Sequence, residues 1–97
     1  MNRLMKYNEA KGFRFTLSEA GQEEVIGLND GYIYAKLEQL ECIIHNNIAV
    51  YVNDATEEDY ILFTDELVIE DIDIKKIKVK LLSKLADIYN VQVTLKR

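Results

Sequence analysis

The spacing of the apolar residues changes along this chain, and this change constrains its fold more than any other feature. Residues 12–17 alternate apolar and polar side chains, with Phe13, Phe15 and Leu17 on one side, as in a half-buried β-strand. Elsewhere apolar residues recur every three or four positions, the spacing of an amphipathic helix. The chain has no Pro and no Gly/Ser linker to divide its 97 residues, so we expect one domain spanning residues 1–97.

Two segments have helical spacing. The first predicts a helix over residues 31–45 and rests on Ile33, Leu37, Leu40 and Ile44. The second predicts a helix that begins near Asp73 and ends at Asn90, with Asp71 or Asp73 as its N-cap. Its apolar stripe consists of Ile74, Ile77, Leu81, Leu85 and Ile88.

Other segments have the composition of strands. Residues 48–53 and 60–64 predict an antiparallel pair, and 91–95 predicts a last strand. Residues 23–28 predict a weaker strand, while 66–70 fit either a short extension of the sheet or a loop. The resulting order predicts an α+β fold in which an antiparallel sheet of four to five strands carries two helices on one face. A ferredoxin-like arrangement has this order, and an α+β sandwich of other connectivity is the alternative.

Charge is segregated along the chain. The 38 residues between Lys36 and Lys75 contain eleven carboxylates and no Lys or Arg, whereas the residues from Lys75 onward carry seven bases and one acid. Segregated charge steers association with partners and says little about fold. A net charge of −5 argues against direct binding to nucleic acid or to an anionic membrane.

The acidic block supplies the candidate binding residues, because carboxylates beside an aromatic side chain suit a surface that docks on a basic partner. The predicted binding residues are Asp54, Glu57, Glu58, Asp59, Tyr60, Asp65 and Glu66. Residues 54–59 lack the spacing of a calcium-binding loop, so a solvated hairpin tip is the simpler interpretation of that run. We expect no metal and no cofactor.

Two other groups of residues are candidate sites. Cys42 and His45 would be neighbours on the predicted first helix, but nothing identifiable orients the imidazole, so an incidental thiol is the simpler interpretation. Lys76, Lys80 and Lys84 would form a basic ridge on the second helix, without Arg or interleaved aromatics. Balancing of the acidic block, or a solvated face, explains that ridge better than phosphate binding.

These observations predict a small non-enzymatic binding protein, such as an inhibitor or immunity-type factor that occupies the basic, nucleic-acid-binding surface of a partner protein. The alternative is a self-associating structural or regulatory module, for example a homodimer, without catalytic activity. One cysteine and the absence of a long apolar run predict a cytoplasmic protein. A composition rich in Ile, Lys, Asn, Glu and Tyr without Pro is typical of AT-rich bacterial or phage genomes.

Overall fold

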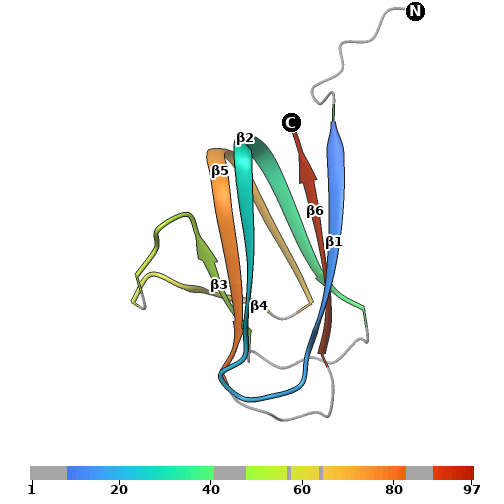
Figure 1. Cartoon of the computed structure of the whole chain (residues 1–97), viewed down its shortest axis with the longest axis vertical. Helices are drawn as coiled ribbons and strands as arrows, with labels where there is room; N and C mark the ends of the chain where they lie inside the picture. The colour runs from blue at the N-terminus through green and yellow to red at the C-terminus, as the bar shows by residue number, and fades with distance from the viewer. Residues whose placement is uncertain (1–8, 41–47, 57, 64, 83–88) are drawn as a thin grey trace, which may run out of the picture.

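The regular structure of this protein is entirely β-strand in the residues that the computed structural model describes, namely 9–40, 48–56, 58–63, 65–82 and 89–97. The strands are β1 (Ala10–Leu17), β2 (Glu23–Gln39), β3 (Ile48–Val52), β4 (Ile61–Phe63), β5 (Glu66–Leu81) and β6 (Tyr89–Lys96). They form one sheet in the order β1-β6-β2-β5-β3-β4, and all of the pairings are antiparallel (Figure 1). The described residues include no helix that is long and apolar enough to cross a membrane.

The predicted α+β fold is therefore wrong, and the ferredoxin-like arrangement falls with it. Residues 31–39, the larger part of the first predicted helix, belong to β2, and residues 41–45 lie outside the described residues. Residues 73–81 of the second predicted helix belong to β5, and residues 83–88 lie outside the described residues. The chain is all-β wherever it is described.

The helical spacing that misled the prediction comes from a bend in the two longest strands. Gly27 of β2 lies opposite Lys76 of β5, but the next pair joins Tyr32 to Ile74, so four residues of β2 face one of β5. Such irregularities interrupt the alternation of faces. Buried Ile74 and buried Ile77 are consequently three positions apart, as they would be on a helix, although they lie on one strand.

The bend divides the sheet into two layers that pack against each other. The first layer contains β1, β6, residues 34–39 of β2 and residues 66–70 of β5. The second layer contains residues 23–27 of β2, residues 76–81 of β5, β3 and β4. In Figure 1, β2 and β5 fold over at the top of the molecule, which places β1 on the right and β3 on the left.

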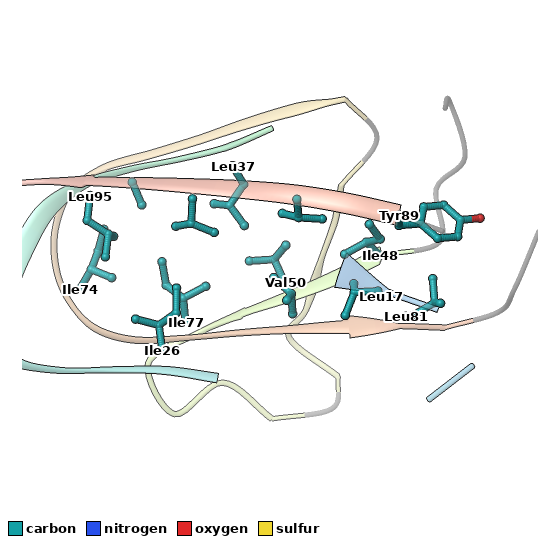
Figure 2. Packing of buried hydrophobic residues seen from close by; sticks show 14 of the residues in the cluster. Leu17, Ile26, Leu37, Ile48, Val50, Ile74, Ile77, Leu81, Tyr89 and Leu95 are labelled. Atoms are coloured by element: carbon teal, nitrogen blue, oxygen red, sulfur yellow. The ribbon is translucent and has the colours of Figure 1, made fainter. Parts of the chain in front are cut away.

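The hydrophobic core fills the space between these layers. Leu37 and Leu95 reach from the first layer toward Ile26, Val50 and Ile77 of the second (Figure 2). Burying apolar side chains from both layers is the main stabilising contribution available to such a fold. The complete buried cluster comprises Leu17, Ile26, Tyr32, Ala35, Leu37, Ile48, Val50, Ile74, Ile77, Val79, Leu81, Tyr89, Val91, Val93 and Leu95.

The strand predictions fared better than the helix predictions. The strand over residues 12–17 is confirmed as part of β1, and its three apolar side chains contact the core as expected. The predicted antiparallel pair forms between β3 and β4, within the predicted ranges 48–53 and 60–64 except for residue 64, which lies outside the described residues, and residues 91–95 lie in β6. Residues 66–70 extend the sheet as the beginning of β5, and residues 23–28 begin β2.

Asn53 attaches the end of β3 to the bend in β5. Its side-chain Oδ1 accepts hydrogen bonds from the backbone N–H groups of Lys75 (2.7 Å) and Lys76 (3.2 Å), and its Nδ2 donates to the Asp73 carbonyl (2.9 Å). Its φ of 57° lies in the left-handed region, which Asn tolerates better than most residues. The connection from β3 to β4 therefore starts from a fixed position beside the bend.

Candidate functional site

Residues 60–62, at the start of β4, form an exposed apolar segment at one edge of the second layer. β4 is the last strand in the sheet order, and the described residues pair with it only on the β3 side. Tyr60, Ile61 and Leu62 remain 39%, 41% and 47% exposed. A sheet edge of this kind presents unpaired backbone groups together with apolar side chains, and both favour contact with another chain.

Carboxylates lie on both sides of this strand in the sequence. Glu58 and Asp59 come just before Tyr60, Asp65 and Glu66 follow β4, and all four are exposed. Asp59 accepts a hydrogen bond from the Thr56 hydroxyl (3.0 Å), which stabilises the turn before β4. An apolar edge bordered by negative charge is the principal feature that the structure makes from the acidic block.

The predicted binding residues form two groups and do not lie in a single cluster. Asp54 lies beside the bend, 3.3 Å from the Lys76 ammonium, while Glu66 begins the first-layer part of β5. The seven steps from Glu66 to Asp73 span roughly 23 Å at about 3.3 Å per residue, which keeps the ends of that segment well apart. Glu57 lies outside the described residues.

Partial neutralisation distinguishes some of these acids from the others. The Lys76 ammonium offsets Asp54, although the Asp54 side chain is 98% exposed, and the Lys36 ammonium lies 3.9 Å from Glu66. Exposed pairs of this kind contribute little to stability because water and salt screen them. They do lower the local negative potential, so Glu58 and Asp59 are the stronger candidates for attracting a cationic partner.

Tyr60 has a structural role that its sequence position did not reveal. Its ring centroid lies 5.9 Å from that of Tyr51, a β3 residue that is only 2% exposed. The Lys78 ammonium covers the same Tyr51 ring at 4.2 Å from its centroid. Tyr60 therefore packs on Tyr51 and helps to fix the start of β4 against β3, while its own ring stays partly exposed.

The basic ridge predicted on a helix is a row of lysines on a strand. Lys76, Lys78 and Lys80 alternate with buried Ile77, Val79 and Leu81, so they share the outer surface of the second layer. Glu23 lies 3.8 Å from Lys78 and 4.0 Å from Lys80, and Asp54 lies near Lys76. These two carboxylates thus offset part of the charge of the row, and Lys84 lies outside the described residues.

Sequence reasoning missed a cluster of polar side chains that joins the start of β1 to the end of β6 and to β2. The Arg97 guanidinium donates two hydrogen bonds to Glu9 Oε2, at 2.9 and 2.7 Å, and the Tyr32 hydroxyl donates to Glu9 Oε1 at 3.4 Å. The hydrogen bonds from Arg97 hold the pKa of the Glu9 carboxyl below its usual value. Because these residues are far apart in sequence, no local pattern could have revealed the cluster.

The described residues give no support to a catalytic or metal-binding centre. They contain no group of three His, Cys, Asp or Glu side chains that could hold a metal ion. Within the same part of the chain, no buried side-chain nitrogen or oxygen lacks a hydrogen-bond partner. The Cys42 and His45 pair lies outside the described residues, as does the segment that carries it.

Comparison with known proteins adds no family to this description. A scan against protein-family models finds no match, and a search of curated proteins finds no significant relative. The functional argument therefore rests on the chain itself.

Proposed function

We propose that this chain is a non-enzymatic binding protein that engages a basic surface of a partner protein through β4 and its acidic borders. The observation that carries the proposal is the exposure of Tyr60, Ile61 and Leu62 at a sheet edge, between Glu58–Asp59 and Asp65–Glu66. Its setting is the cytoplasm, since a single cysteine leaves no intrachain disulfide of the kind that stabilises small secreted domains.

The mode of recognition follows from the chemistry of an edge strand. A partner strand laid against β4 would use the open backbone groups for hydrogen bonds and would cover the exposed apolar side chains. Carboxylates on either side would accelerate the encounter with a cationic strand and disfavour an anionic one. A basic groove that ordinarily receives nucleic acid is one surface with the required charge.

Binding of nucleic acid by this chain itself is a weaker explanation of its surface. The outer lysines of β5 have carboxylate neighbours at 3.3 to 4.0 Å, and the whole chain carries a net charge of −5. Nucleic-acid affinity depends on cations that can replace the counterions of the phosphates. The lysine row supplies little unbalanced charge for that purpose.

The test uses a synthetic peptide of alternating Lys and Val and a matched peptide of alternating Glu and Val, each labelled for fluorescence anisotropy. We expect the Lys peptide to bind, the Glu peptide not to bind, and the affinity of the Lys peptide to fall as salt rises. Glu58→Ser/Asp59→Ser should weaken binding of the Lys peptide by about tenfold, roughly the effect of 1.4 kcal/mol.

The matched control is Glu19→Ser/Glu24→Ser, which changes the net charge equally and alters exposed or half-buried acids away from β4. It should leave the affinity for the Lys peptide within about twofold, because these residues lie outside the proposed edge. Equal loss in the two double variants would show that total charge, not the β4 edge, governs binding. Absence of Lys-peptide binding to the unmodified protein would refute the proposal directly.

A further inference from the structure

Among the residues that the structure describes, the bend in β2 and β5 leaves four sheet edges, and these edges differ in charge. The second-layer part of β2 carries Glu23 and Glu24, and the first-layer part of β5 carries Glu66 and Glu70. β4 has acids on both of its borders. Only β1 is basic, since residues 10–17 include Lys11 and Arg14 and no acid.

The backbone of β1 is open on the side away from β6. Glu9 and Arg97 exchange two backbone hydrogen bonds, at 2.8 and 2.9 Å, immediately beside the first residue of β1. In an antiparallel ladder such pairs recur at every second residue, so the N–H groups of Gly12 and Arg14 point away from β6. In the described structure, no other strand pairs with β1 on that open side.

The apolar side chains of the two end strands also match. Phe13 and Phe15 lie on the core-facing side of β1 but are only half-buried. Ile61 lies opposite buried Val50, which places it on the core-facing side of β4, yet it is 41% exposed. An edge-to-edge pairing of these strands would remove apolar surface on both partners from water.

We propose that β4 of one copy of this chain pairs with β1 of a second copy. This inference rests on the proposed function, because it names the partner of the same β4 edge. Charge selects β1, since the other edges carry acids that would repel the borders of β4. The two strands stand at opposite ends of the sheet order, so the contact is head-to-tail and can propagate from copy to copy.

The predicted contact is weak, because a strand of three residues buries less surface than a stable dimer requires. We expect the weight-average mass in sedimentation equilibrium to rise with protein concentration and to fall as salt increases. Two charge reversals test the pairing: Lys11→Glu/Arg14→Glu on β1 and Glu58→Lys/Asp59→Lys beside β4. Each should weaken self-association by about tenfold or more when alone, since like charges then face each other.

An equimolar mixture of the two charge-reversed variants is the decisive test of the pairing. In the mixture, the acidic β1 of one variant meets the basic border of β4 on the other, and their unaltered edges also match, so association should return. Association of the unmodified protein that persists in both variants, or that the mixture does not restore, would overturn the pairing. Circular dichroism and the thermal midpoint of each variant show whether it is folded.

Gly12→Pro tests the backbone contact without changing charge. Its N–H points to the open side, so proline removes a donor for the second copy and leaves the β6 ladder intact. The variant should stay folded and lose self-association, and undiminished association would contradict the pairing. A monomeric unmodified protein that still binds the Lys and Val peptide would overturn this inference alone, whereas failure of peptide binding would refute the proposed function.

Discussion

The two parts of β5 have the same alternating pattern but very different environments. Residues 66–70, in the first layer, alternate between exposed and half-buried side chains, whereas residues 77–81, in the second, alternate between buried and half-buried ones. In the described part of the chain, the first part pairs only with β2, while the second lies between β2 and β3. Alternation thus determines which way a side chain faces, and the number of neighbouring strands determines how deeply it is buried.

This comparison explains where surface for binding remains. The second part of β5 is central, so its inward side chains complete the core and its outward lysines cover Tyr51 and pair with carboxylates. The first part is an outer strand and leaves Val68 41% exposed. Within β5, the second part therefore contributes more buried side chains to the core, and the first part leaves an open edge.

The same substitution in the two parts of β5 should have the largest and most unequal effect. Leu81→Ala removes a side chain that is 0% exposed and should lower the free energy of unfolding by about 2–5 kcal/mol, because a cavity remains. Leu67→Ala, its matched control, affects a half-buried residue and should cost roughly 1 kcal/mol. Urea unfolding of both variants measures the difference. Equal losses would contradict the deeper burial of the second part of β5.

The alternation in this second part was readable in the sequence as Ile77, Lys78, Val79, Lys80 and Leu81. It was outweighed by the spacing of Ile74, Ile77 and Leu81, which is helical only because a bend separates the first two. Similarly, the helical spacing predicts that Ile33 and Leu40 lie on one buried stripe, but they are 39% and 40% exposed. Local periodicity cannot distinguish a helix from a bent strand when the irregularity depends on pairing with a distant segment.

The candidate site shows the same limit. Composition alone predicts that Glu58, Asp59 and Tyr60 are exposed near a strand pair. The structure places them there. The strand order, however, decides that β4 is at one end of the sheet and the basic strand β1 is at the other. Strand order arises from long-range pairing, such as β1 with β6, and no short pattern encodes it.

The bend that joins the two parts of β5 brings Gly31 of β2 close to Asp73. A Cβ added at Gly31 would overlap the Asp73 carboxylate, so Gly31→Ala should displace that exposed side chain from Lys75 and lower the free energy of unfolding by about 1 kcal/mol or less. The double variant Gly31→Ala/Asp73→Ala removes the overlapping carboxylate and should recover most of this loss. Urea unfolding of the single and double variants tests the coupling. If the two effects simply add, contact between these residues does not restrict the bend.

The smallest expected effect concerns the first layer and varies with pH. Hydrogen bonds from Arg97 lower the pKa of Glu9, so this carboxylate stabilises the fold above the ordinary carboxyl pKa of about 4.3. Its contribution is lost as pH falls through the lower folded-state value. Glu9→Gln should therefore reduce the thermal midpoint at pH 7, and its difference from the unmodified protein should diminish in acid.

Glu19→Gln is the matched control for this titration, because it also removes one carboxylate but from an exposed turn. Its midpoint should follow that of the unmodified protein at each pH, since an exposed carboxylate gains little from folding. If the difference in thermal midpoint between Glu9→Gln and the unmodified protein stayed constant down to the lowest pH, Glu9 would act through packing or neutral hydrogen bonds. If that difference disappeared in acid, the charge of Glu9 would be what joins β1 to the end of β6. This contact stabilises the first layer without adding to the buried core.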